Sequence, residues 1–312
     1  MSAFGPEAQP PPKLGPSPYG AHQRWEQRHN RRVLLPVLGL VGLAIPALIV
    51  LGLLTTNVGN GPMLVGTMAA VLPVLPVVAA FLWVDRWEPE PSGLLLAAFL
   101  WGSGVSVLGA GLVNDTAAIV GDHILGKGSG DLIGAVVSAP IIEEAFKGAF
   151  LIGLVWWRRR EFDGVVDGIV YAGLVAAGFA FTENILYFGR AFASDGLVGE
   201  AGGVIAVFIL RGILSPFAHP LFTAMIGIAV GIAVRRSNRT AMVVLALIGY
   251  LAAVSLHALW NASAGFGFLP IVYIAIMVPL FAALVGLVVW QRRREQRVVA
   301  AQLPGFASAG WI

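Results

Sequence analysis

The chain has 312 residues, of which 57% are hydrophobic and only 12% are charged, and its formal net charge is +3. A mean hydropathy of +0.82 is too apolar for a water-soluble domain of this length, so the composition predicts a polytopic membrane protein. The chain has no cysteine, which excludes disulfides, thiolate nucleophiles and thiolate metal ligands.

The apolar segments define the predicted fold. Residues 1–32 are rich in proline, glycine and charge, and we expect a disordered cytoplasmic arm there. A span needs about 20 apolar residues. Eight such segments follow, near residues 33–54, 62–84, 92–113, 132–157, 164–188, 204–234, 241–262 and 269–290. We therefore predict an all-α, multi-pass protein of the plasma membrane, with one eight-span domain over 33–291 and a basic cytoplasmic tail over 292–312.

The placement of basic residues predicts the topology, because cytoplasmic loops carry the excess of lysine and arginine. With a cytoplasmic N-terminus, 16 of the 20 basic residues fall on the cytoplasmic side, and only Lys127 and Arg190 fall on the other. Lys147 lies within a span and Arg211 near a span end. An even number of spans with both termini cytoplasmic fits this pattern, which also favours contact with lipid headgroups over binding to nucleic acid.

The fourth segment carries charged residues near its middle. Each of Glu143, Glu144 and Lys147 costs roughly 2.5 to 3.5 kcal/mol at the bilayer centre on the translocon scale. Their spacing allows either carboxylate to meet the ammonium on one helix face. Pro140 removes a backbone donor, which should free the Val136 carbonyl and kink the helix. The alternative is a structural ion pair, but two carboxylates exceed what one lysine can neutralise.

The next three segments also carry polar residues between apolar turns. These residues are Glu183 and Asn184 in the fifth segment, His219 between two prolines in the sixth, and His257 with Asn261 in the seventh. The last two share a helix face because they are four residues apart. Each position has a structural alternative: a helix exit for Glu183, a satisfied core histidine for His219, and a hydrogen-bonded pair between helices for His257.

Together these side chains match the hydrolysis of an amide, either assisted by a metal or driven by glutamate alone. Imidazole and carboxylate suit Zn²⁺, and three protein ligands with one open position define a catalytic site. We predict Zn²⁺ held by ligands from Glu183, His219 and His257, with Glu143 as a further candidate. A spare carboxylate, Glu143 or Glu144, could take the proton from water. Lys147 and Asn261 could stabilise an oxyanion.

These motifs resemble a known family. The pattern Glu143-Glu144-x-x-Lys147, the stretch from Phe179 to Asn184, His219, and His257-x-x-x-Asn261, with the loop 85–91, resemble the PrsW intramembrane proteases. That family is similar to the larger group of CAAX prenyl proteases and bacteriocin-processing immunity proteins. The resemblance covers about residues 80–262.

This resemblance implies a membrane-embedded endopeptidase, classed as a metalloprotease, that cuts a transmembrane protein such as an anti-sigma factor. It also implies a site made of Glu143, Glu144, Glu183, His219, His257 and Asn261. The chain departs from the CAAX branch in two ways. It has Glu-Glu-x-x-Lys in place of Glu-Glu-x-x-x-Arg, and Glu183 in place of a histidine.

Two other classes of protein are compatible with buried glutamates and histidines. A proton- or ion-coupled transporter could use them as a relay, but it should show paired halves with corresponding broken helices. No such correspondence is visible, because the polar residues occupy segments four to seven. A membrane scaffold with structural ion pairs would not need so many polar groups. We therefore favour the protease.

Counting residues along the helices predicts how deep the site lies. Glu143, Glu183, His219 and His257 each lie about 22 to 27 Å from the cytoplasmic end of their segment. Because the hydrocarbon core is about 30 Å thick, we expect these four residues to lie at the same depth in its outer half. The site should then be open to the extracytoplasmic side. Substrates should then be cut near their outer membrane boundary.

Overall fold

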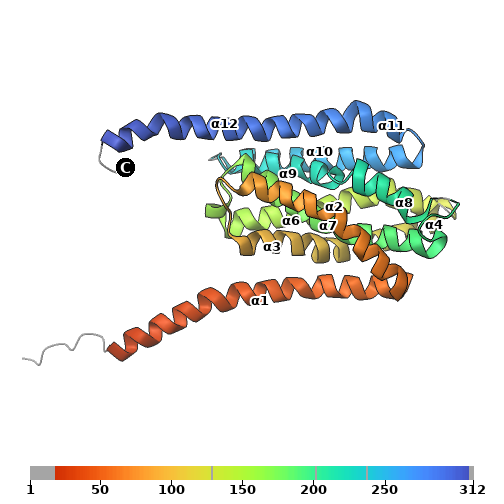
Figure 1. The fold of residues 1–312 in the computed structure, drawn as a ribbon, viewed down its shortest axis with the longest axis horizontal. Coiled ribbons are helices and arrows are strands. Elements are labelled where there is room, and N and C mark those ends of the chain that lie inside the picture. The colour runs from red at the N-terminus through yellow and green to blue at the C-terminus, as the bar shows by residue number, and fades with distance from the viewer. Residues whose placement is uncertain (1–17, 128, 201, 237, 309–312) are drawn as a thin grey trace, which may run out of the picture. The chain divides into compact units, whose positions relative to one another are not determined.

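A computed structural model of the chain describes residues 18–127, 129–200, 202–236 and 238–308, and these residues form helices and no strand (Figure 1). The helices, with η marking π and 3₁₀ segments, are α1 (Pro18–Val58), α2 (Asn60–Asp85), α3 (Ser92–Leu100), η1 (Trp101–Ser106), α4 (Val107–Leu125), α5 (Ser129–Ile133), η2 (Gly134–Ser138), α6 (Ala139–Trp157), η3 (Arg159–Glu161), α7 (Val165–Asp195), α8 (Gly203–Phe208), η4 (Ile209–Leu214), α9 (Ala218–Ala233), α10 (Arg239–Gly265), α11 (Leu269–Val272), η5 (Tyr273–Met277) and α12 (Val278–Ser308).

The chain divides into two compact units, Met1–Val41 and Gly42–Ile312. In the first unit the described residues are helical and form the start of α1, although the sequence predicts a disordered arm up to residue 32. Residues 1–17 of that arm lie outside the described residues. Residues 19–35 contain no proline, so nothing in the backbone prevents a helix there. The division into arm, membrane domain and tail stays a prediction.

Seven helical stretches are long and apolar enough to cross a membrane, which confirms a polytopic all-α protein. They are Pro36–Val58, Asn60–Asp85, Ser92–Ile124, Val165–Asp195, Gly203–Ala233, Arg239–Gly265 and Leu269–Gly305. The count is one fewer than the eight segments expected. The missing stretch is the charged one, which α5, η2 and α6 form without a break. Its three charged side chains in α6 lower its apolar character, so its crossing stays a prediction, as does the cytoplasmic location of both termini.

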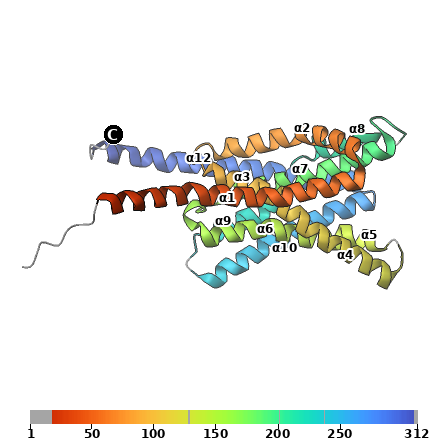
Figure 2. The ribbon, with the colours of Figure 1, turned by 90° about the horizontal axis from the view of Figure 1, so that it is seen from below.

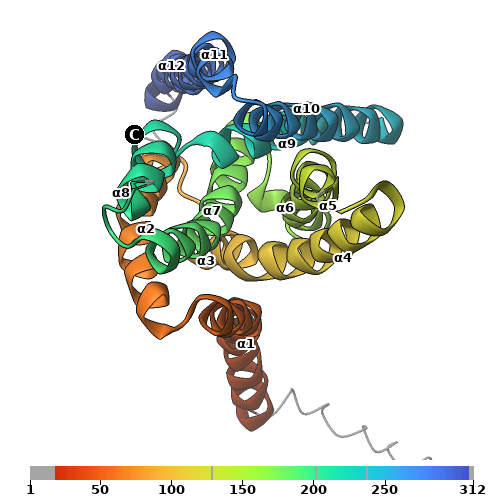
Figure 3. The same cartoon turned by 90° about the vertical axis from the view of Figure 1, so that its right-hand side faces the viewer.

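Helix α7 is the central element of the second unit. It lies among α2, α3, α6 and α9 when the helices are viewed end on (Figure 3). In its most apolar stretch 83% of the residues are buried, against 33% or less for the other candidate spans. A polar side chain in that buried stretch of α7 must therefore find its partners inside the protein.

The α7 and α9 helices pack at backbone distance. A Cβ atom built on Gly168 of α7 would lie 2.1 Å from the carbonyl oxygen of Gly227 in α9, and the reverse substitution would clash equally. Small residues at helix crossings allow this close approach in membrane proteins. Helix α10 in turn runs alongside α9 and α6 (Figure 2). The four helices that carry the predicted site are thus neighbours.

Candidate active site

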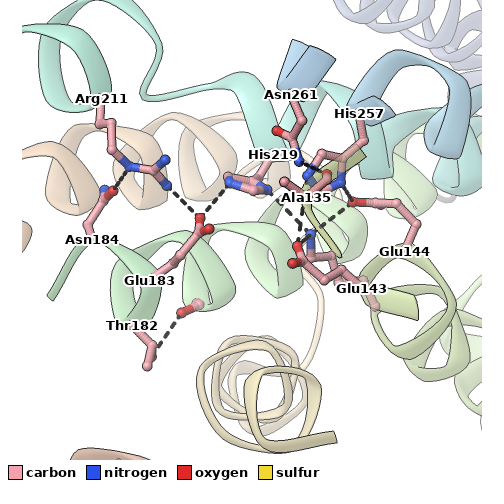
Figure 4. A network of polar contacts seen from close by, with 12 residues as sticks. Ala135, Glu143, Glu144, Thr182, Glu183, Asn184, Arg211, His219, His257 and Asn261 are labelled. Atoms are coloured by element: carbon pink, nitrogen blue, oxygen red, sulfur yellow. Dashed lines mark hydrogen bonds and ion pairs between the residues drawn. The ribbon is translucent and has the colours of Figure 1, made fainter. Parts of the chain in front are cut away.

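Four helices bring their predicted polar residues into one cluster (Figure 4). Glu143 comes from α6, Glu183 from α7, His219 from α9 and His257 from α10. His219 and Glu183 are 2.8 Å apart, and His257 and Glu143 are 3.9 Å apart. Lys147 joins the two pairs, because its Nζ atom is 3.4 Å from both Glu143 and His219. The four segments thus bring these residues together, and their depth in the bilayer stays a prediction.

Lys147 lies at the centre of this cluster and is fully buried. Its Nζ atom is 2.8 Å from Oε1 of Glu144, 3.4 Å from Oε2 of Glu143 and 3.4 Å from Nδ1 of His219. It also lies 3.8 Å from the centre of the Phe179 ring, which favours a cation over its face. The spacing predicted that either carboxylate could meet the ammonium, and Lys147 in fact contacts both. These contacts hold the ammonium group in place.

Glu144 is fully buried and accepts hydrogen bonds from three side chains. Besides Lys147, the donors are the hydroxyl of Thr223 at 2.8 Å and Nδ1 of His257 at 3.1 Å. Because the bond uses Nδ1, it leaves Nε2 of His257 facing Glu143. A carboxylate that fixes the tautomer and orientation of an imidazole in this way is typical of metal and hydrolase centres.

Glu183 lies behind His219 instead of facing the centre of the cluster. Its Oε2 atom is 2.8 Å from Nε2 of His219 and also pairs with Nη2 of Arg211. Arg211 donates a second hydrogen bond to Oδ1 of Asn184 at 2.7 Å and stacks over the Tyr187 ring. The sequence prediction missed this role of Arg211, because its position near a span end suggested only topology. The one feature of the sequence that could have indicated this role is the charge of Arg211 within an apolar segment.

Glu143, His219 and His257 form the group that could hold a metal ion. One ligand atom from each lies within 4.8 Å of the others, and the described residues contain no other such group. Each imidazole has a carboxylate behind it, Glu183 or Glu144, as metal-binding histidines usually do. The predicted set named Glu183 as a ligand, whereas the geometry gives Glu143 that position and Glu183 a supporting one.

The balance of charged groups in the cluster would also favour a bound metal cation. The carboxyl groups of Glu143, Glu144 and Glu183 face the two cationic groups of Lys147 and Arg211. With the three carboxyl groups ionised and both histidines neutral, the cluster carries one net negative charge, in a region where an uncompensated charge is costly. The chemistry of the donor set, two imidazoles and one carboxylate, suits Zn²⁺.

Asn261 makes a hydrogen bond that the sequence did not predict. Its amide donates to the Ala135 carbonyl at 2.8 Å. In the π-helical turn η2 each N–H bonds five residues back, as Ala139 does to Gly134. The next donor would be the N–H of residue 140, but Pro140 has none. The Ala135 carbonyl is therefore left without a helical hydrogen bond, and the Asn261 amide supplies one. The sequence predicted that Pro140 would free the Val136 carbonyl, which is four residues back as in an α-helix. In the π turn the hydrogen bonds reach five residues back, so the freed carbonyl is that of Ala135. The oxyanion role of Asn261 stays a prediction.

The acidic loop at residues 86–91 contacts the far end of α7. Tyr171 donates a hydrogen bond to Oε2 of Glu90 at 2.9 Å, and the Glu90 amide donates to Asp85 at 3.1 Å. Burial raises the pKa of Glu90 to about 7. Tyr171 precedes Glu183 by twelve residues of α7, which is about 18 Å of helix. The loop therefore anchors α7 away from the cluster.

The fold and the cluster together define a class of protein: a polytopic helical membrane protein with a buried centre of glutamate, histidine and lysine. Residues 90–284, more than half of the chain, match the family described as "PrsW family intramembrane metalloprotease". The chain therefore belongs to the PrsW family. No solved structure matches it.

Curated relatives agree with this family. The chain is 30% identical over 163 residues to Protease PrsW of Geobacillus kaustophilus, covering 52% of this chain and 64% of that protein. It is 30% identical over 166 residues to Protease PrsW of Bacillus subtilis, covering 52% and 66%. For Protease PrsW of Clostridioides difficile the values are 28% over 162 residues, 50% and 62%. The match thus covers less than two thirds of each of these relatives.

Proposed function

We propose that this protein is an intramembrane endopeptidase that hydrolyses a peptide bond in a membrane-protein substrate. The observation that carries the proposal is the convergence of Glu143, His219 and His257 from three helices, with a second carboxylate behind each imidazole. A structural ion pair would not need this arrangement. Membership of the PrsW family supports the same reaction.

Glu143 is the residue that we assign as the general base. Its carboxylate has only two partners, Lys147 at 3.4 Å and His257 at 3.9 Å, and both distances are long. Glu144, in contrast, accepts three shorter hydrogen bonds, and Glu183 is held by Arg211 and His219. A base must have a lone pair free for the proton of the attacking water. Glu144 and Glu183 then serve to orient the two histidines.

In a metal-assisted version of this proposal, Glu143 would be a metal ligand instead of the general base. Glu143, His219 and His257 would hold Zn²⁺, which would supply a Lewis acid and activate water near neutral pH when bound. In the version without a metal, Glu143 acts as base alone and Lys147 provides the positive charge next to it. Both versions predict that substitution of Glu143 abolishes cleavage. Only an assay after removal of the metal can therefore distinguish them.

The finer substrate assignment is a membrane-anchored regulator, such as an anti-sigma factor, cut near its outer membrane boundary. It rests on the family resemblance and on the residue count along the helices. A buried site in the outer half of the bilayer would favour a helix that can unwind there and expose its backbone.

The test is a search for new chain ends. The purified protein is reconstituted in lipid vesicles with a membrane-protein extract, and new N-termini are labelled and identified by mass spectrometry. We expect cuts in single-span proteins with the wild type, and none with Glu143→Gln. The exposed Glu200→Gln serves as the matched control and should behave as wild type. Equal cutting by Glu143→Gln and wild type would refute the assignment.

A chelator arm of the same assay tests the metal. We expect 1,10-phenanthroline to abolish cutting and added Zn²⁺ to restore it. Undiminished cutting by a preparation in which elemental analysis finds no metal would leave the glutamate version standing and exclude the zinc version.

A further inference from the structure

Helix α9 does not continue directly from η4. Residues 215–217 form a turn between the two, immediately before His219. An apolar cavity of about 240 Å³ lies beside this turn. Its lining comes from the end of η4, the turn itself, α9, the end of α10, η5 and the start of α12. Its largest side chains are Phe217, Leu221, Trp260, Tyr273, Met277 and Phe281.

A small polar recess at the cluster of glutamates and histidines shares part of its lining with this cavity. The recess measures about 20 Å³ and is lined by His219, Arg211 and Asn184 among others. Ser215, Pro216, Ala218 and Trp260 line both spaces. An apolar group in the cavity would therefore lie next to the residues that surround His219.

The turn also offers backbone groups to an extended chain. The Pro216 carbonyl cannot accept the usual helical bond from residue 220, because Pro220 has no N–H. The neighbouring Leu214 carbonyl, by contrast, is used by the Tyr273 hydroxyl at 2.8 Å. In an apolar environment an unused carbonyl is costly, and the N–H of an unwound substrate segment could satisfy it.

We propose that the cavity lined by Phe217, Leu221, Trp260, Tyr273, Met277 and Phe281 receives a large apolar side chain of the substrate, next to the bond that is cut. This inference rests on the proposed function. The size is suitable, because an engineered cavity of about 150 Å³ in another protein holds benzene. Leucine, isoleucine, methionine and phenylalanine side chains therefore fit, and charged side chains do not, because the lining contains no residue of opposite charge.

The test changes the size of the cavity and reads the sequence of the cuts. Met277→Trp should fill it and Phe281→Ala should enlarge it, since both side chains line the space. Ile274→Trp is the matched control, because Ile274 lies in the same segment, is 69% exposed and does not line the cavity. Each variant is reconstituted with the same membrane-protein extract, and the residues flanking every new N-terminus are tabulated.

We expect one flanking position to be large and apolar in cuts made by the wild type and by Ile274→Trp. With Met277→Trp the ratio of leucine or phenylalanine to alanine at that position should fall at least about tenfold, the usual scale for a change in a hydrophobic pocket. With Phe281→Ala the residue preference at that position should shift towards tryptophan. This second variant tests the proposal if Met277→Trp does not fold.

An unchanged preference in both variants would overturn the proposal and would mean that the cavity holds a lipid chain or nothing. Failure of the proposed function is a different result, since it would show no cuts above those of Glu143→Gln even with the wild-type cavity.

Discussion

Removing the lysine at the centre of the cluster should destabilise the protein strongly. In Lys147→Met the side chain keeps a similar length but loses its charge, and Glu144 loses a cationic partner at 2.8 Å. Both partners are fully buried, so water cannot replace the ammonium. Breaking a buried ion pair by removing one partner typically costs about 3 to 5 kcal/mol. We expect a loss of that size in the free energy of unfolding.

The measurement is reversible unfolding in mixed micelles, followed by tryptophan fluorescence. The double variant Lys147→Met, Glu144→Gln removes both charges and should recover at least about half of the loss, because neither partner then remains buried and unpaired. Ile152→Met, at a half-exposed position of the same helix, is the control and should change stability by no more than about 0.5 kcal/mol. A loss below about 1 kcal/mol in Lys147→Met, or additive losses in the double variant, would refute the reasoning.

Three further predictions concern other parts of the chain. Arg211→Gln and Arg211→Lys should each slow cleavage about 10- to 100-fold without unfolding the protein, because Glu183 then no longer holds His219 firmly. The pKa of Glu90 rises from its usual 4.5 to about 7 on folding, so the folded state binds this proton more tightly. Stability should therefore fall as pH rises from 4.5 to 7, and Glu90→Gln should flatten that slope in thermal unfolding. Reporter fusions after residues 120, 195 and 265 should read extracytoplasmic, and a cytoplasmic signal at two of them would contradict the eight-span topology.

The sequence predicted the cluster well because charged residues in apolar helices are conspicuous. Glu143, His219 and His257 stood out because a polar residue is costly in an apolar segment, and similar residue counts from the cytoplasmic ends of their segments predicted one level for them. The spacing of Lys147 also predicted that either glutamate could meet it, since an α-helix fixes which positions share a face. These inferences needed only helix geometry and the low polarity of the bilayer.

The sequence could not supply contacts between helices. Which glutamate contacts which histidine depends on how α6, α7, α9 and α10 pack together, including the close approach of α7 and α9 at Gly168 and Gly227. For this reason Glu183 was assigned as a metal ligand, whereas the structure places it between Arg211 and His219. The π turns were equally hidden, because their register depends on packing and not on composition.

The central claim is that Glu143, His219 and His257 act as one hydrolytic centre. The most direct measurement is the rate of cleavage at one mapped site by wild type, Glu143→Gln, His257→Ala and the double variant, in vesicles with equal amounts of folded protein. When residues act as one catalytic unit, the losses of rate caused by substituting them are strongly non-additive. We predict that each single variant loses at least about 10³-fold and that the double variant is no slower than either. A single variant within about tenfold of wild type, or losses that multiply in the double variant, would contradict the claim.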